Sequence, residues 1–151
     1  MPYLRMLKID NMRKLLFSSH NRKSIDWAAL FLRLGFGLLM IPQHGWMKLK
    51  NFDVLKTEFM DFMGLGSATT LCLVIFAELF CSILLVLGLF TRLASIPLII
   101  TTIVIMNTHH WELVGKPELG TAYFIAYVTI LFLGPGKYSL DGLIVKNTSR
   151  R

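Results

Sequence analysis

The sequence contains few cysteines and few acidic residues. Only Cys72 and Cys81 are present, and nine residues of helix would hold them roughly 13 Å apart on opposite faces, too far for a disulfide. No Cys-x-x-Cys, haem-attachment or iron–sulfur spacing occurs. No acidic residue has a ligand spacing to His109 and His110, which would point about 100° apart on a helix. The sequence therefore predicts no metal site and no intrinsic redox cofactor.

Glycine-rich phosphate loops are also missing. Gly64 and Gly66 lack the third glycine of a dinucleotide fingerprint, and the run Gly-Pro-Gly-Lys at 134–137 lacks the upstream glycine and the following Ser or Thr of a P-loop. Both stretches are interpreted as turns.

The composition is that of a membrane protein. Apolar residues make up 54% of the chain, charged residues only 17%, and the mean hydropathy is +0.59. The net charge of +7 comes from basic residues gathered before the first apolar run and after the last. This distribution predicts topogenic charge facing the cytoplasm, with no nucleic-acid surface.

Four apolar runs, at 25–41, 68–90, 93–111 and 119–133, predict an all-α membrane protein, a bundle of four antiparallel transmembrane helices. Only Thr91 and Arg92 separate the second run from the third, which predicts a tight hairpin and places both ends of the chain on one side. The tails and the Arg92 turn hold eleven Lys and Arg, against four in the opposite loops. We therefore expect a protein integral to the cell (inner) membrane, with cytoplasmic termini.

The domain organisation follows from these runs. Residues 1–24 form a basic cytoplasmic tail, 25–145 the membrane domain in contact with the lipid bilayer, and 146–151 a second basic tail. In the 42–67 connection, Phe52, Leu55, Phe59 and Phe62 recur at helical spacing, which predicts a short interfacial helix between the first two spans.

Two ionisable residues lie inside the apolar runs: Arg33 in the first and Glu78 in the second. A charge at bilayer depth is costly and faces a partner or a cavity. Because the two have opposite signs and similar predicted depths, we expect them to form an intramembrane ion pair. Whether that pair is functional or only fixes the register of the helices stays open at this point.

A polar pocket that opens outward from this pair is the sharper hypothesis. Residues 33, 37, 40 and 44 share one stripe of the first helix, and Thr102 and His109 share a face of the third. The candidate residues are Gly37, His44, Lys48, Thr102, His109, Tyr123 and Tyr127. The alternative is structural, since tyrosine favours membrane interfaces without any ligand.

Several spaced motifs together resemble the DoxX family of small four-helix membrane proteins. They are RLGFGLL at 33–39, HGWMKL at 44–49, FAELF at 76–80, LGLFTRLA at 87–94 and LGPGKYSLD at 133–141. The resemblance covers roughly residues 25–145 and singles out Arg33, Gly37, Gly45, Lys48, Glu78, Gly88 and Arg92. It implies no catalytic residues that could be transferred to this chain.

The resemblance implies a role beside redox enzymes. Some members of the family resemble membrane subunits of quinone-linked oxidoreductases, including thiosulfate:quinone oxidoreductase, and others are placed with redox-defence partners. We therefore expect an accessory subunit of a membrane oxidoreductase, with a bound quinone as its one implied cofactor and other membrane or redox subunits as partners. A non-catalytic scaffold or assembly partner is the alternative, and a small-solute carrier is a third.

Overall fold

The computed structural model describes residues 22–108 and 118–148. All regular structure within these residues is helical. In chain order the elements are α2 (Arg22–Met40), η1 (Ile41–Trp46), α3 (Met47–Lys50), α4 (Phe52–Glu58), α5 (Ser67–Ile75), η2 (Phe76–Cys81), α6 (Ser82–Leu87), α7 (Thr91–Thr108), α8 (Glu118–Leu133) and α9 (Leu140–Thr148). The segments η1 and η2 are π-helical turns inside two longer continuous helices.

Three of these helices are long and apolar enough to cross a membrane: 22–50, 67–87 and 91–108. Helix α8 is equally apolar but has 16 residues. Large apolar side chains point outward along the helices, as expected of a surface that lipid surrounds; they include Phe31, Leu38, Phe76, Ile100, Ile125 and Phe132.

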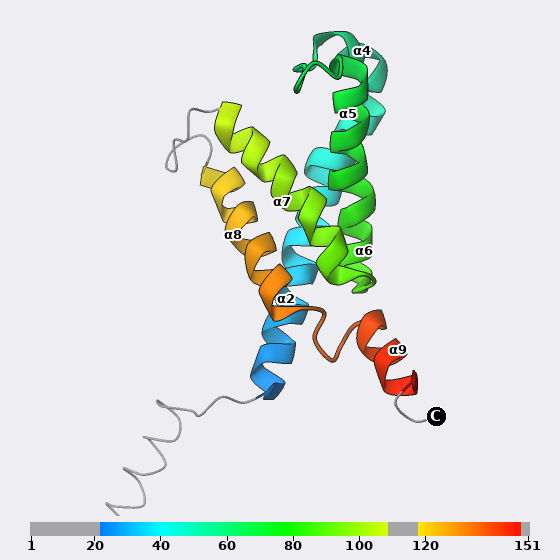
Figure 1. The fold of residues 1–151 in the computed structure, drawn as a ribbon, viewed down its shortest axis with the longest axis vertical. Coiled ribbons are helices and arrows are strands. Elements are labelled where there is room, and N and C mark those ends of the chain that lie inside the picture. Colours follow the sequence, from blue (N-terminus) through cyan, green and yellow to red (C-terminus); the bar gives the residue numbers. More distant parts are fainter. Residues whose placement is uncertain (1–21, 109–117, 149–151) are drawn as a thin grey trace, which may run out of the picture.

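The helices form one bundle with its two ends clearly separated. Helix α7 packs beside α8, and the long α2–α3 helix runs beside the α5–α6 helix, as Figure 1 shows. Helix α4 lies at one end of the bundle, whereas the start of α2 and α9 lie at the other (Figure 1). The buried core between the helices is apolar and includes Met40, Cys81, Leu85, Leu98, Tyr127 and Ile130.

The first helix is longer than the sequence predicted. We expected a connection from residue 42, but the helix continues to Lys50. Pro42 does not end it, because this residue lies in the first turn of η1. The hydrogen bonds there change from the i→i+4 to the i→i+5 pattern, and this change accommodates the missing N–H of proline. This extension keeps His44 and Lys48 on the helix.

Helix α4 is the helical part of the predicted 42–67 connection. Its Phe52 and Leu55 are half-buried on one side. On its exposed side, Lys56 donates a hydrogen bond of 2.8 Å to Asp53 and holds the pKa of that carboxyl below its usual value. A short helix is thus present between the first two long helices, but it ends at Glu58, before Phe59 and Phe62, and its place at the membrane interface stays a prediction.

The hairpin between α6 and α7 lies three residues earlier than predicted. We expected Thr91 and Arg92 to form the turn, but both belong to α7. Gly88 ends α6 in the left-handed conformation, at a φ of 69°. The first amide groups of α7 are capped from a distance: Asp141 accepts hydrogen bonds of 2.9 Å from the backbone N–H groups of Phe90 and Thr91.

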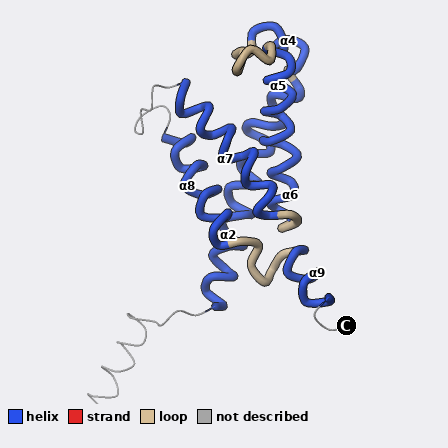
Figure 2. Tube along the Cα trace, viewed as in Figure 1, coloured by secondary structure: helices blue, strands red, loops and turns tan. Residues whose placement is uncertain are grey.

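The segment 134–139, which joins α8 to α9, also contacts other helices. It passes beneath the bundle between α8 and α9, as Figure 2 shows. The N–H of Lys137 donates to Asp26 near the start of α2, and the N–H of Asp141 donates to the carbonyl of Gly88. The segment 137–141 is thereby held against the start of α2 and the end of α6.

We expect Asp141→Ala to lower the free energy of unfolding by about 1–2 kcal/mol, because two amide donors at the start of α7 lose their acceptor. Hydrogen exchange by mass spectrometry should speed up in the peptide that covers Phe90 and Thr91. Asp53→Ala is the matched control, since its carboxylate is exposed and contacts Lys56. Unchanged exchange at Phe90 and Thr91 would contradict the capping role.

Candidate functional site

The intramembrane carboxylate of Glu78 pairs with Lys48. The Nζ of Lys48 lies 2.6 Å from Oε1 and 2.5 Å from Oε2 of Glu78. The Glu78 side chain is 0% exposed, and the Lys48 side chain is 21% exposed. The predicted pair of Arg33 with Glu78 is therefore wrong, although the prediction that Glu78 is a buried and paired charge is confirmed.

Arg33 lies much nearer to the other end of the bundle. It is buried on the predicted stripe with Ala29, Gly37 and Met40, but its Nη2 donates a hydrogen bond of 2.7 Å to the carbonyl of Tyr138. On the first helix, the backbone of Glu78 lies against Gly45, twelve positions beyond Arg33, or about 18 Å along the axis. That separation exceeds the reach of an arginine side chain.

The two π-helical segments meet at Gly45. A Cβ atom at this position would lie 2.8 Å from the backbone N of Leu79 and 2.9 Å from the carbonyl carbon of Glu78. Only glycine permits so close an approach of two backbones. The contact brings η1, which carries His44, directly against η2, which carries Glu78. Isolated π turns inside α-helices are frequent at functional sites.

Aromatic side chains extend the cluster from Lys48 and Glu78 toward α8. The ring of His44 lies edge-on to Tyr123 at 5.8 Å between centroids, and Tyr123 stacks on Tyr127 at 5.8 Å. Phe36 closes the row against Tyr123 at 5.4 Å. The carboxylate of Glu78 is close enough to act electrostatically on His44, Tyr123 and Tyr127. We call Lys48, Glu78, His44, Tyr123 and Tyr127 the polar cluster.

Gly37 and Thr102, two other predicted pocket residues, lie outside the polar cluster. Gly37 contacts α6, as its size predicted: a Cβ there would lie 2.6 Å from Val86 and 3.4 Å from the carbonyl of Ser82. Thr102 is buried, and its hydroxyl donates to the carbonyl of Ile99 in the same helix. His109 lies outside the described residues.

A pocket floored by Arg33 and Glu78 is contradicted by this arrangement. The two charges lie at different levels of the bundle, and both oxygens of Glu78 are bonded to Lys48. Lys48 is partly exposed and His44 is half-buried, so both side chains reach the surface of the bundle. Lys48 carries three N–H donors and His44 can donate, accept and exchange a proton.

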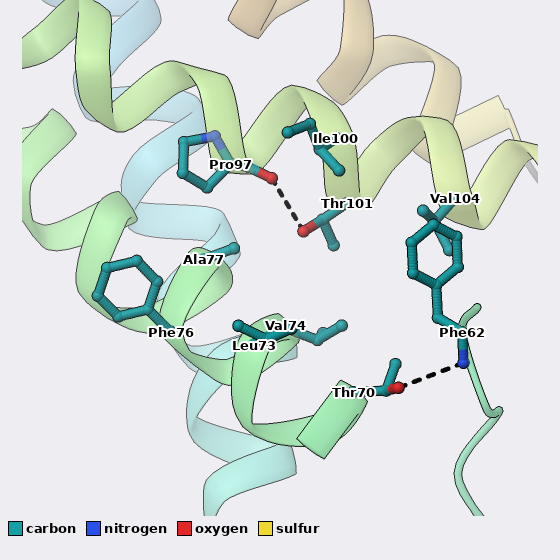
Figure 3. A pocket seen from close by; sticks show the side chains of 10 residues that line it. All are labelled: Phe62, Thr70, Leu73, Val74, Phe76, Ala77, Pro97, Ile100, Thr101 and Val104. Atoms are coloured by element: carbon teal, nitrogen blue, oxygen red, sulfur yellow. Dashed lines mark hydrogen bonds between the residues drawn. The ribbon is translucent and has the colours of Figure 1, made fainter. Parts of the chain in front are cut away.

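An apolar groove lies between α5, η2 and α7. It has a volume of about 300 Å³ and is lined by Phe62, Thr70, Leu73, Ala77, Ile100 and Val104, among other residues (Figure 3). Its hydroxyl groups are engaged with the backbone: Thr101 donates to the carbonyl of Pro97, and Thr70 accepts from the N–H of Phe62 (Figure 3). The groove therefore offers an apolar surface. One of its lining residues, Ala77, directly precedes Glu78 in the sequence.

Within the part of the chain that the structure describes, no group of three or more His, Cys, Asp and Glu side chains could hold a metal ion. The side chains of the polar cluster can form hydrogen bonds and exchange protons.

Sequence reasoning did not predict two contacts of the site: the ion pair of Lys48 with Glu78 and the backbone contact at Gly45. Lys48 was predicted as a pocket candidate but was counted among the loop charges, because the first span was predicted to end at residue 41. Its spacing of four residues from His44 was the available signal, since it continues the stripe of 33, 37, 40 and 44. The close contact at Gly45 had no signal beyond its place in the HGWMKL motif.

The comparisons with known proteins give one match. The model of the DoxX family matches residues 28–111, which include His44, Gly45, Lys48 and Glu78. No curated protein and no solved structure matches the chain.

Proposed function

This chain belongs to the DoxX family and is an integral membrane protein, and we propose that it is a quinone-binding subunit of a membrane oxidoreductase. The observation that carries the proposal is the buried pair of Lys48 and Glu78, set between two facing π-helical segments and continued by His44 and Tyr123. A charged cluster of this kind at membrane depth is costly and marks a functional site by default.

The proposal includes a fourth span and an orientation. Helix α8 is apolar throughout and packs along α7, which supports its crossing a locally thin bilayer despite its 16 residues. Arg22, Lys23, Arg92, Lys137 and Lys146 gather at the end of the bundle that carries α9, which supports placing that end in the cytoplasm of the cell (inner) membrane. The polar cluster then lies in the outer half.

The residues of the polar cluster suit a quinone headgroup. A bound quinone would supply two-electron, two-proton redox chemistry. Lys48 can donate a hydrogen bond to one carbonyl oxygen while Glu78 holds its ammonium group in place. His44 can donate to a carbonyl and pass a proton, and Tyr123 orients its ring from α8. The electrons would come from a partner redox subunit.

One observation favours a non-catalytic scaffold instead. Lys48 bonds to both oxygens of Glu78, so the pair is saturated without any ligand and could serve only to hold η1 against η2. The two functions differ in whether a small molecule reaches His44 and Lys48.

We expect the protein, purified in mild detergent, to release a stoichiometric quinone on extraction with organic solvent, identified by mass spectrometry. Decylubiquinone added to the emptied protein should quench the fluorescence of Trp46, which lies in η1 beside the cluster. His44→Phe should weaken that binding about tenfold, by the loss of one hydrogen bond in a protein interior.

Trp46→Phe is the control for the signal: loss of the quench in this variant assigns it to Trp46 and not to Trp27 or Trp111, the other two tryptophans of the sequence. The absence of both extracted quinone and saturable quenching, together with a co-purifying partner protein, would reject quinone binding and favour the scaffold.

A further inference from the structure

A second cavity, distinct from the polar cluster, lies at the end of the bundle that carries α9. It has a volume of about 570 Å³. Leu89 and Phe90 line it from the turn before α7, and Arg92 and Leu93 line it from the first turn of α7. Ile144 and Val145 line it from α9. We call it the α7–α9 cleft. We propose that the α7–α9 cleft binds an anionic phospholipid, with the acyl chain against the apolar walls and the phosphate on Arg92.

The level of the cleft in the membrane favours a lipid. The helices 67–87 and 91–108 are both long and apolar enough to cross a bilayer, so the residues 88–90 that join them lie at the membrane surface. Lipid phosphates occupy that level, and hydrocarbon lies directly below it. A cleft at this depth meets the headgroup and the chain of one lipid molecule together.

Arg92 is placed to receive a phosphate. It is exposed, and its guanidinium lies over the bare backbone of Gly134, where a Cβ atom would come within 3.3 Å of Nε and Nη2. With the other described residues, this guanidinium makes no hydrogen bond or ion pair. A planar guanidinium with donors to spare matches the geometry of a phosphate.

The acidic residue of the cleft does not neutralise Arg92 through a direct contact. Asp141 directs both carboxylate oxygens at the start of α7: one accepts from the N–H of Phe90, and the other accepts from the N–H and the hydroxyl of Thr91. The N-terminal amides of α7 thus stabilise the Asp141 charge. Lys137 and Lys146 add positive charge at the same end of the bundle. The sign of the surface therefore suits an anionic headgroup better than a zwitterionic one.

The walls of the cleft suit an acyl chain. Phe90 is 61% exposed, Leu93 66% and Val145 67%, although all three are large and apolar. Hydrocarbon is the medium that removes such side chains from water at the edge of a bilayer. Charge and apolar surface thus meet in one cleft, as they do in one phospholipid.

We expect native mass spectrometry of the full chain in neutral detergent to show one retained molecule of dioleoylphosphatidylglycerol at low lipid concentration, and no comparable retention of dioleoylphosphatidylcholine. Phosphatidylglycerol should raise the melting temperature, whereas inorganic phosphate at the same concentration should not. Arg92→Gln should weaken phosphatidylglycerol binding about fivefold, as expected for one basic residue at a membrane surface. Val145→Gln should weaken it as well, because it makes one wall polar.

Lys146→Gln is the matched control. It removes the same charge from α9, at a position outside the lining of the cleft. If Lys146→Gln weakens binding as much as Arg92→Gln, the attraction is diffuse surface charge and the site is overturned. Equal binding of phosphatidylcholine, or displacement of the lipid by inorganic phosphate, would overturn it too. The His44→Phe variant should keep its phosphatidylglycerol, which separates this site from the proposed quinone site.

Discussion

Lys48→Met is expected to lower the free energy of unfolding in detergent by about 3–5 kcal/mol, because it leaves the carboxylate of Glu78 buried without its partner. Glu78→Met should be less damaging, since the Lys48 side chain is 21% exposed and can turn its ammonium group to the surface. The double change to Met should destabilise less than Lys48→Met alone. Thermal unfolding followed by intrinsic fluorescence measures all three variants.

Two further variants isolate the pair. Lys56→Met breaks the exposed contact of Lys56 with Asp53 and should change the melting temperature little. Arg33→Met and Glu78→Met should have additive effects, because their partners are Tyr138 and Lys48 and the two sites share no contact. Strong coupling between Arg33 and Glu78, with none between Lys48 and Glu78, would refute the pairing described above.

The local pattern of the sequence predicted much of the fold. The apolar runs located the long helices, and the predicted start and end of the last run differ from α8 by no more than one residue. Helical periodicity placed Arg33, Gly37 and Met40 on one buried stripe of α2, as the structure confirms. The spacing of four between Tyr123 and Tyr127 predicted a shared face, and their rings stack.

The register between helices could not be predicted from the same pattern. Which charge contacts Glu78 depends on the axial offset between the two helices. The close backbone contact at Gly45 fixes that offset, and the hydropathy pattern does not indicate it. Arg33 was the nearer candidate by depth alone. The π turns that align His44 and Glu78 were equally invisible, because they change the number of residues per turn at only one place in each helix.

The end of the bundle that carries α9 shows a second reason why contacts went unpredicted. Gly-Pro-Gly at 134–136 was correctly interpreted as a turn, with positive φ at Gly134 and Gly136. The partners of the segment that follows lie far away in sequence: Asp141 caps α7 across 50 residues, and Tyr138 accepts from Arg33 across 105. Contacts of such sequence separation have no local signature, so α9 and its anchoring went unpredicted.

Gly45→Ala is expected to lower the free energy of unfolding by about 3 kcal/mol, a large loss for one methyl group and at the upper end of what overpacking costs. The added Cβ would meet the backbone of η2 at 2.8 to 2.9 Å, and a backbone cannot move aside as the tip of a side chain can. The two π-helical segments must therefore separate, which lengthens the contact of Lys48 with Glu78. Thermal unfolding in detergent measures the loss.

Gly35→Ala is the matched control, on the same helix and with the same change. A Cβ at Gly35 would meet nothing within 4 Å, so the variant should be as stable as the original chain or gain up to about 1 kcal/mol from its better helix propensity. Because Gly45→Ala already loosens the ion pair, adding Lys48→Met to it should cost less than Lys48→Met costs alone. Equal stability of the Gly35 and Gly45 variants would mean that η1 and η2 do not touch, and the polar cluster would then lose the contact that assembles it.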